Sequence, residues 1–198
     1  MEKVNYQKRL GGLYKASSVR PSVIETPVMS YIVIDGTGNP SGKVFQDAVK
    51  TLYPVAYLLK FMIRERLEVD YGVMPLEVQW KVDREHKESF DWNAMILQPS
   101  LVTRELFREA VQLATLKKDP PRINEIRMDS INEGLCIQML HRGPYGRMNE
   151  TLEKMLDFIE KNEFQSGRDT HDIYLNSIKK AKPENLKTIM RLPIRLPH

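Results

Sequence analysis

The sequence predicts an α+β domain built from two copies of one structural unit. The order strand, strand, glycine turn, helix, strand, strand occurs once before the break at 119–121 and once after it. Gly36 and Gly143 occupy equivalent turns in the two copies. Such a duplication predicts antiparallel sheets paired about a pseudo-two-fold axis, with helices packed on one side. A cleft between the halves is the usual place for a ligand.

This organisation divides the chain into an arm and one domain. We expect residues 1–20 to form a polar, lightly structured N-terminal arm and residues 21–198 to form a single domain. The two halves of the repeat cover about 21–100 and 121–195, and a linking helix at 103–118 joins them.

The first half is read from its periodicity. Strands alternate apolar and polar residues, whereas helices repeat apolar residues every three or four positions. The expected elements are strands at 23–25 and 31–36, a turn at 36–40, a helix at 43–67, strands at 73–82 and 91–97 joined by a charged loop at 83–89, and a helix at 104–118. Pro54 should kink or split the long helix, and Thr103 is the expected N-cap of the last one.

The second half repeats this order with different residues. The expected elements are strands at 123–128 and 135–141, a turn at 143–146, a helix at 147–162, and strands at 171–175 and 186–191. The corner at 134–148, where strand, turn and helix meet, presents Tyr145 between two glycines. Corners on a rigid scaffold often carry ligand contacts, so Tyr145 faces either a ligand or the core.

Composition excludes several classes of protein. The net charge is +4, but 30 basic residues nearly balance 26 acidic ones, and no nucleic-acid-binding module is recognisable. Cys136 is the single cysteine, and the four histidines are scattered. We therefore expect no disulfide framework and no metal site. No signal-peptide pattern and no apolar run of about 18 residues occurs, so we expect a cytoplasmic protein without membrane or nucleic-acid partners.

The aromatic residues of the strands are the first candidates for a ligand site. Alternation places Leu76, Val78 and Trp80 on one face of their strand and Glu77 and Gln79 on the other. Trp92 should lie across from Trp80 on the next strand. Such tryptophans serve either as core or as a ligand platform. The other candidates for ligand contact are Tyr53, Tyr57, His141 and Tyr174, and Tyr71 is a further hydroxyl candidate.

Glu184 is the candidate acid. It immediately precedes the last expected strand, where neighbouring aromatic residues would desolvate its carboxyl group and raise its pKa towards that of a general base. The alternative is a solvated loop glutamate or a cap of a helical turn after Pro183.

Several motifs, taken together, resemble those of a known family. They are the segments 31–36 (YIVIDG), 45–49 (FQDAV), 57–61 (YLLKF), 73–77 (VMPLE) followed by Trp80, 95–99 (MILQP), 133–145 (EGLCIQMLHRGPY), 171–175 (HDIYL) and 183–188 (PENLKT). Their order and spacing resemble the GyrI-like small-molecule-binding domains over nearly the whole chain. This family also provides effector-binding domains of multidrug-responsive transcription regulators. The resemblance is greatest to its stand-alone bacterial subgroup.

The resemblance implies a function. The subgroup looks like cyclopropanoid hydrolases, which detoxify DNA-alkylating natural products that bear an activated cyclopropane. It implies that Glu184 is the catalytic carboxylate that assists the attack of water on the strained ring, and that Trp80 is an aromatic wall. Tyr145, or Tyr71, supplies a wall or a hydroxyl donor. The expected partner is a hydrophobic or aromatic small molecule. The alternative is a non-catalytic drug-binding or effector-sensing protein.

Two departures from the family pattern affect catalysis more than binding. The family usually has a Ser-Asp-Pro-Arg-Arg turn after the 171–175 motif, whereas this chain has Asn176-Ser177-Ile178. The family often has a second tryptophan after the first, and this chain has Lys81 there.

Overall fold

The computed structural model describes residues 1–81, 91–167, 169–177 and 181–196. The charged loop expected at 83–89, Ile178 of the altered turn, and the histidines His86 and His198 lie outside these residues.

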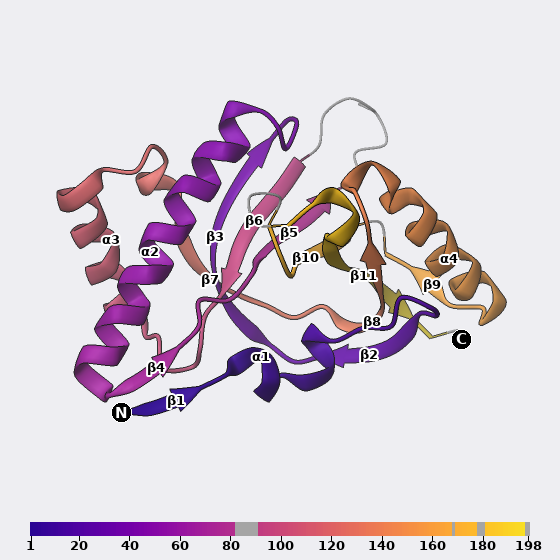
Figure 1. Cartoon of the computed structure of the whole chain (residues 1–198), viewed down its shortest axis with the longest axis horizontal. Coiled ribbons are helices and arrows are strands. Elements are labelled where there is room, and N and C mark those ends of the chain that lie inside the picture. Colours follow the sequence, from indigo (N-terminus) through magenta and orange to yellow (C-terminus); the bar gives the residue numbers. More distant parts are fainter. Residues whose placement is uncertain (82–90, 168, 178–180, 197–198) are drawn as a thin grey trace.

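A large, mostly antiparallel sheet forms the centre of the molecule (Figure 1). Its strands run in the order β2-β8-β11-β10-β5-β6-β3-β7, and β9 pairs with β11. The bounds are β2 Ser22–Thr26, β3 Met29–Thr37, β5 Leu76–Lys81, β6 Asp91–Leu97, β7 Arg127–Ile131, β8 Gly134–Arg142, β9 Gln165–Ser166, β10 Thr170–Tyr174 and β11 Lys187–Arg195. The order reads as two equivalent halves that meet where β10 pairs with β5. The expected duplicated α+β fold is confirmed.

The halves exchange their first strands. In the first half, β3, helix α2 (Lys43–Leu67), β5 and β6 follow one another, and β8, helix α4 (Met148–Lys161), β10 and β11 repeat this order. Strand β2, which precedes β3, pairs instead with β8 of the other half, and β7 pairs with β3. Each half therefore takes one edge strand from the other half, which favours cooperative folding of both.

Both long helices lie on the same face of the sheet. Phe45 of α2 packs against Trp80 and Trp92, while Met155 and Ile159 of α4 pack in a second core with Met190. Met190 lies opposite Asp172, and Trp80 lies opposite Thr170. Thr170 and Asp172 are two positions apart on β10, so all these side chains lie on one face of the sheet. We call it the helix face. Helix α3 (Arg104–Lys118) packs against α2 instead.

Helix α2 is continuous through Pro54, so of the two effects expected of the proline, a kink or a split, the split does not occur. The lost backbone hydrogen bond is outweighed by packing on both sides of the proline, because Leu52, Val55, Ala56 and Leu59 are almost completely buried. Thr103 caps α3 as predicted, its side chain accepting a hydrogen bond from the Leu106 N–H at 3.3 Å.

Two strand predictions need correction. The strand expected at 73–82 begins only at Leu76, as β5, because Pro75 cannot donate to a ladder, and a separate short strand, β4 (Val69–Tyr71), precedes it. Instead of a strand at 123–128, a 3-10 turn η2 (Ile123–Glu125) precedes β7.

The N-terminal arm is more ordered than its polar sequence suggested. It contains β1 (Glu2–Val4), which pairs in parallel with β4, the short helix α1 (Tyr6–Arg9) and the 3-10 turn η1 (Gly11–Tyr14). Leu13 and Tyr14 are buried in the main core. No helix in the described part of the chain has the length and apolar character needed to cross a bilayer.

The close approach of Gly36 to Trp92 provides a test of the sheet packing. A Cβ atom at Gly36 would lie 2.3 Å from the Trp92 ring, which is fully buried and cannot move aside. We expect Gly36→Ala to lower the free energy of unfolding by about 1–3 kcal/mol, measured by denaturant unfolding. The control is Gly72→Ala, where nothing lies within 4 Å of the new atom; equal losses in both variants would contradict this packing.

Candidate functional site

The pairing of β5 with β10 brings together residues that are far apart in the sequence. On the helix face, Trp80 of β5 lies near Asp172 and Tyr174 of β10. The Trp80 indole N–H donates a hydrogen bond to Asp172 Oδ2 at 2.8 Å. Trp80 was predicted to be a ligand wall, and the structure supplies a carboxyl group beside it that the sequence analysis did not select.

Asp172 is an unusual carboxyl group because it is buried without a full set of partners. Its exposed fraction is 5%, and its Oδ1 atom has no hydrogen-bond partner among the described residues. Burial raises the pKa of Asp172 to about 7, although the Trp80 hydrogen bond, the charge of His171 and the Tyr174 hydroxyl partly offset this effect. Such a group exchanges a proton near neutral pH, as an acid–base residue must.

Aromatic side chains surround this carboxyl group. Phe45 stacks on Trp80 with ring centroids 6.0 Å apart, and Tyr145 meets Tyr174 edge-on at 5.4 Å. Burial and the nearby Asp172 raise the pKa of Tyr145, and burial raises that of Tyr174 well above its ordinary value. Both hydroxyls therefore stay protonated and remain hydrogen-bond donors at neutral pH. We call these four aromatic residues and Asp172 the aromatic cluster.

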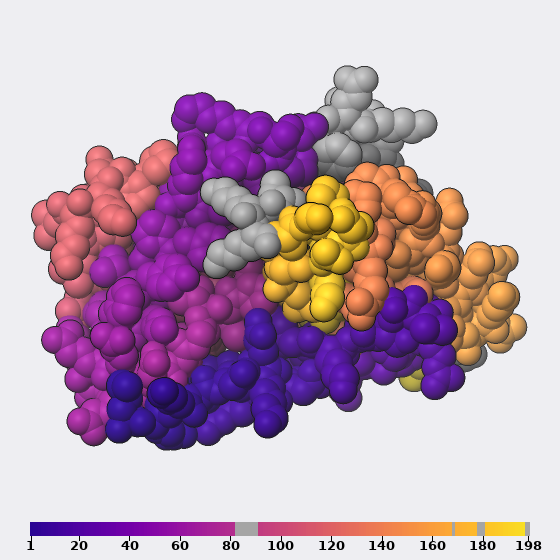
Figure 2. All heavy atoms as spheres, in the orientation of Figure 1, coloured from indigo at the N-terminus to yellow at the C-terminus, as the bar shows by residue number. Residues whose placement is uncertain are grey.

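The aromatic cluster reaches the surface at Tyr145, which is 37% exposed. Figure 2 shows α2 and the segment that precedes β11 on the same face of the molecule. Tyr53 and Tyr57 lie on α2; Tyr53 is half-buried, and Tyr57 is exposed and stacks with Phe61. The structure thus brings Trp80, Tyr145 and Tyr174 together, and both tyrosines of α2 are in part accessible.

Two other predicted ligand residues, Trp92 and His141, are buried and have hydrogen-bond partners within the protein. Trp92 is opposite Trp80, as predicted, but it is fully buried and its indole N–H donates to the Gly38 carbonyl at 3.1 Å. His141 is buried, with Nδ1 2.9 Å from the Thr151 hydroxyl and Nε2 3.2 Å from the Pro144 carbonyl. These contacts fix the corner that carries Tyr145, so His141 supports the site from behind.

Tyr71 lies in a separate part of the molecule. It belongs to β4, in the two-stranded sheet formed with β1, and its ring packs edge-on against Tyr6. Burial raises the pKa of Tyr71, and its hydroxyl has no hydrogen-bond partner among the described residues. It lines a surface notch with Lys60 and Asp70. Among the described residues, the aromatic ring that contacts Tyr71 is Tyr6 and not a member of the aromatic cluster.

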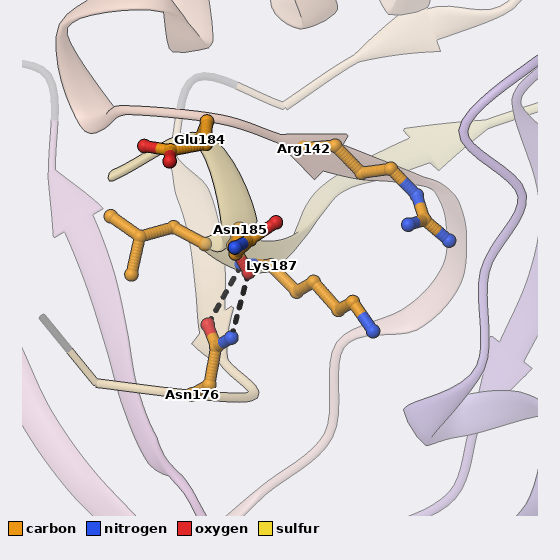
Figure 3. A pocket seen from close by; sticks show the side chains of 6 residues that line it. Arg142, Asn176, Glu184, Asn185 and Lys187 are labelled. Carbon is orange, nitrogen blue, oxygen red and sulfur yellow. Dashed lines mark hydrogen bonds between the residues drawn. The ribbon is translucent and has the colours of Figure 1, made fainter. Parts of the chain in front are cut away.

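Glu184 is exposed in a 3-10 turn, η4 (Pro183–Asn185), directly before β11. It lines a hollow of about 330 Å³ together with Arg142, Asn176, Asn185, Leu186 and Lys187. In Figure 3 its carboxylate points away from the Arg142 and Lys187 side chains. Asn176 ties the turn to β11, because it donates to the Asn185 carbonyl and accepts from the Lys187 N–H. The position before the last strand is as predicted, but Glu184 is not desolvated.

Asp172 could have been found from the sequence by one further step. Alternation in His171–Tyr174 places Asp172 on the same face as Tyr174, which had been selected. The sequence did not reveal that this strand lies beside the one carrying Trp80. Within the described residues, no cluster of three or more His, Cys, Asp or Glu side chains is arranged to hold a metal ion.

Comparison with known proteins identifies similar proteins over nearly the whole chain. The family model for the GyrI-like small molecule binding domain matches residues 20–195. None of the curated proteins matches the chain.

Three solved structures illustrate the range of similarity. A hydrolase from Listeria innocua encoded by lin2189 is 32% identical, with a TM-score of 0.87 and coverage of 98% of this chain and 100% of that one. A second structure of a Listeria innocua hydrolase is 33% identical, with a TM-score of 0.86 and coverage of 97% and 100%. The EcmrR C-terminal domain is 13% identical, with a TM-score of 0.56 and coverage of 90% and 98%, and it shares the fold.

The raised pKa of Asp172 predicts how stability depends on pH. The pKa is about 7 in the folded protein and about 3.8 in the unfolded chain, so folding favours the protonated form. Stability should therefore fall as pH rises from about 4 to 7 and change little from this group above that range. Asp172→Asn removes the ionisation. We therefore compare the free energy of unfolding of this variant with that of wild type at each pH. The difference, variant minus wild type, should be higher at pH 8 than at pH 4 by on the order of 3 kcal/mol.

Urea unfolding at both pH values measures this difference. The matched control is Asp157→Asn, on the surface of α4, which should show little dependence. Parallel curves for Asp172→Asn and wild type would contradict the proposed desolvation of Asp172.

Proposed function

The chain belongs to the GyrI-like family of small-molecule-binding domains, and from this premise we propose that it hydrolyses activated cyclopropanes carried by flat, hydrophobic aromatic ligands. The observation that carries the proposal is the aromatic cluster. In it, a buried carboxyl group, one oxygen of which has no hydrogen-bond partner among the described residues, lies among aromatic rings. The two Listeria innocua hydrolases, similar over their full length, support an enzymatic role.

Aromatic stacking would supply affinity and orientation. A planar ligand entering beside Tyr145 would stack on the exposed edge of the aromatic cluster, and such contacts are worth about 0.5–1.5 kcal/mol beyond area burial. Fixing the ligand in one orientation also lowers the barrier, because the attacking water and the strained carbon are held together. Asp172 at the base of the aromatic cluster would then meet the polar end of the ligand.

The reaction we propose is addition of water across one ring bond. The water oxygen bonds to the less substituted ring carbon and loses a proton to a base. The cyclopropane carbon–carbon bond breaks, and its electron pair moves into the conjugated carbonyl, whose oxygen takes up a proton. Ring strain provides the driving force, so no cofactor is required.

Two carboxyl groups divide the proton transfers in this scheme. Glu184, in its solvent-facing hollow, is the proposed base for water. Asp172, whose pKa is about 7, is the proposed acid that protonates the carbonyl oxygen. The Tyr145 hydroxyl, held protonated, is a second donor to that oxygen. Tyr71 is the weaker candidate for this role because it packs against Tyr6 in the other sheet.

A second function is favoured by the same free oxygen. When ionised, Asp172 would pair with a lipophilic cation in a site of low dielectric, and the protein would bind or sense drugs without changing them. The two functions have opposite pH dependence, since the acid role needs protonated Asp172 and the counter-ion role needs the ionised form.

Incubation with a duocarmycin-type cyclopropane distinguishes these roles. We expect mass spectrometry to detect the water adduct with wild type, and we expect Glu184→Gln and Asp172→Asn each to lower kcat by about 10²–10⁴-fold. Glu160→Gln, an exposed residue of α4, is the control and should match wild type.

Each outcome assigns a role. Full turnover by Glu184→Gln would remove it as the base and leave Asp172 as the working carboxyl group. Quenching of tryptophan fluorescence without any adduct would instead support the binder. Rates that rise as pH increases through 7 would contradict the acid role of Asp172.

A further inference from the structure

Four charged side chains are buried together on the sheet face opposite the aromatic cluster. His171 Nε2 lies 2.9 Å from Glu77 Oε2, and His171 Nδ1 lies 2.9 Å from Glu133 Oε2. The Arg191 guanidinium lies 3.3 Å from the same Glu133 oxygen. His171, Glu77 and Arg191 are at most 1% exposed. We call these four residues the ionic cluster.

The N-terminal arm seals the ionic cluster from water. The Tyr14 hydroxyl donates a hydrogen bond to Glu77, and Arg191 donates to the Leu13 carbonyl at 2.9 Å. Gln138 donates to the carbonyls of Gly12 at 2.6 Å and Lys15 at 3.2 Å. The polar arm therefore docks through directed hydrogen bonds, which explains why a segment with few apolar residues is ordered.

The ionic cluster and the aromatic cluster share two strands. His171 and Asp172 are consecutive on β10, and Glu77 and Trp80 both belong to β5, with side chains on alternate faces. Only the thickness of the sheet separates the His171 ring from the Asp172 carboxyl group. A shift of β10, or a change in the charge of His171, would therefore reach Asp172 directly.

The charge of His171 is well defined. Burial alone would lower its pKa, but the carboxylates of Glu133 and Glu77 outweigh burial and raise the pKa to about 9. Burial likewise opposes ionisation of Glu133, yet His171 and Arg191 lower its pKa to about 2. His171 is thus protonated at neutral pH, and the ionic cluster combines two acidic with two basic side chains.

We propose that His171 is a positioning residue for Asp172: clamped by Glu77 and Glu133 beneath the arm, it fixes β10 and holds a positive charge behind the ligand site. That charge favours the anionic form of Asp172 and so sets the pH at which the site changes from acid to counter-ion. The arm takes part by keeping the ionic cluster dry, because a hydrated His171 would be screened. The inference rests on the proposed role of Asp172.

The other charged and titratable neighbours are arranged consistently with this assignment. Around His171 they are Glu77 on β5, Glu133 before β8, Arg191 on β11, and, beyond Glu77, Tyr14 of η1 and Tyr31 of β3. Around Asp172 they are Tyr174 and Tyr145, both neutral. Within the described residues, His171 is therefore the charged group that acts on Asp172.

The test follows Asp172 without any ligand. The Trp80 indole N–H donates to Asp172, so its resonance in a ¹H–¹⁵N spectrum, assigned with Trp80→Phe, reports ionisation of the carboxyl group. The double variant Glu77→Gln/His171→Gln removes one negative and one positive charge and leaves the Glu133–Arg191 pair. We expect the Asp172 midpoint to rise by about 0.5–1 pH unit.

The control removes an equally balanced but exposed ion pair on α2 and α3, in the variant Arg66→Gln/Glu109→Gln. It should leave the midpoint unchanged. An unchanged midpoint in a folded Glu77→Gln/His171→Gln variant would overturn the proposal, because a merely structural His171 changes stability and not the titration of Asp172.

Wild-type protein supplies the same test if the double variant does not fold. His171 should lose its proton near pH 9. The Trp80 indole resonance should then shift a second time, with the same midpoint as the resonances of the His171 ring nitrogens. Titration of His171 with no response at Trp80 would overturn the proposal.

Binding of ethidium, followed by its fluorescence, distinguishes the proposed role of His171 from the proposed role of Asp172 in the ligand site. If the Asp172 midpoint moves in the variant and affinity does not follow, the role of His171 stands and the role of Asp172 in the ligand site fails.

Discussion

The antiparallel pairing of β5 with β10 is the constraint on which the rest of the structure depends. It joins the two halves of the repeat and has no equivalent elsewhere in the strand order. Because side chains alternate, this pairing places Trp80 with Asp172 on one face and Glu77 with His171 on the other. The aromatic cluster and the ionic cluster behind it are therefore consequences of the same register.

Periodicity and element order were sufficient to predict the fold, because each strand and helix is encoded locally. They predicted the repeat, the faces of β5 and the opposition of Trp80 and Trp92. Contacts between distant strands were not accessible in this way. Asp172 and Trp80 are 92 positions apart, and nothing in the single sequence states that β10 lies beside β5. The exchange of β2 and β7 between the halves was missed for the same reason.

The acidic residues also show that the sequence alone does not reveal contacts between distant segments. Glu184 was selected for its place before a strand, a place the structure confirms, but η4 turns its side chain to solvent. Glu77, Glu133 and Asp172 looked like ordinary polar residues, because burial of a charge becomes favourable only when distant partners assemble around it. The ionic cluster achieves that balance. Asp172 does not: within the part of the chain that the structure describes, one of its oxygens has no hydrogen-bond partner. A buried carboxyl group of this kind opposes stability, which is typical of functional sites.

The central claim is that Asp172 and its aromatic neighbours form the ligand site. The most direct measurement is the pKa of Asp172, followed by carboxyl ¹³C resonances, with and without a saturating flat aromatic cation such as ethidium. A cation bound beside the carboxyl group stabilises its charged form, so the pKa should fall from about 7 by about 1–3 units. A neutral analogue, 6-phenylphenanthridine, should raise it or leave it unchanged. The same pKa with and without bound cation would contradict the account.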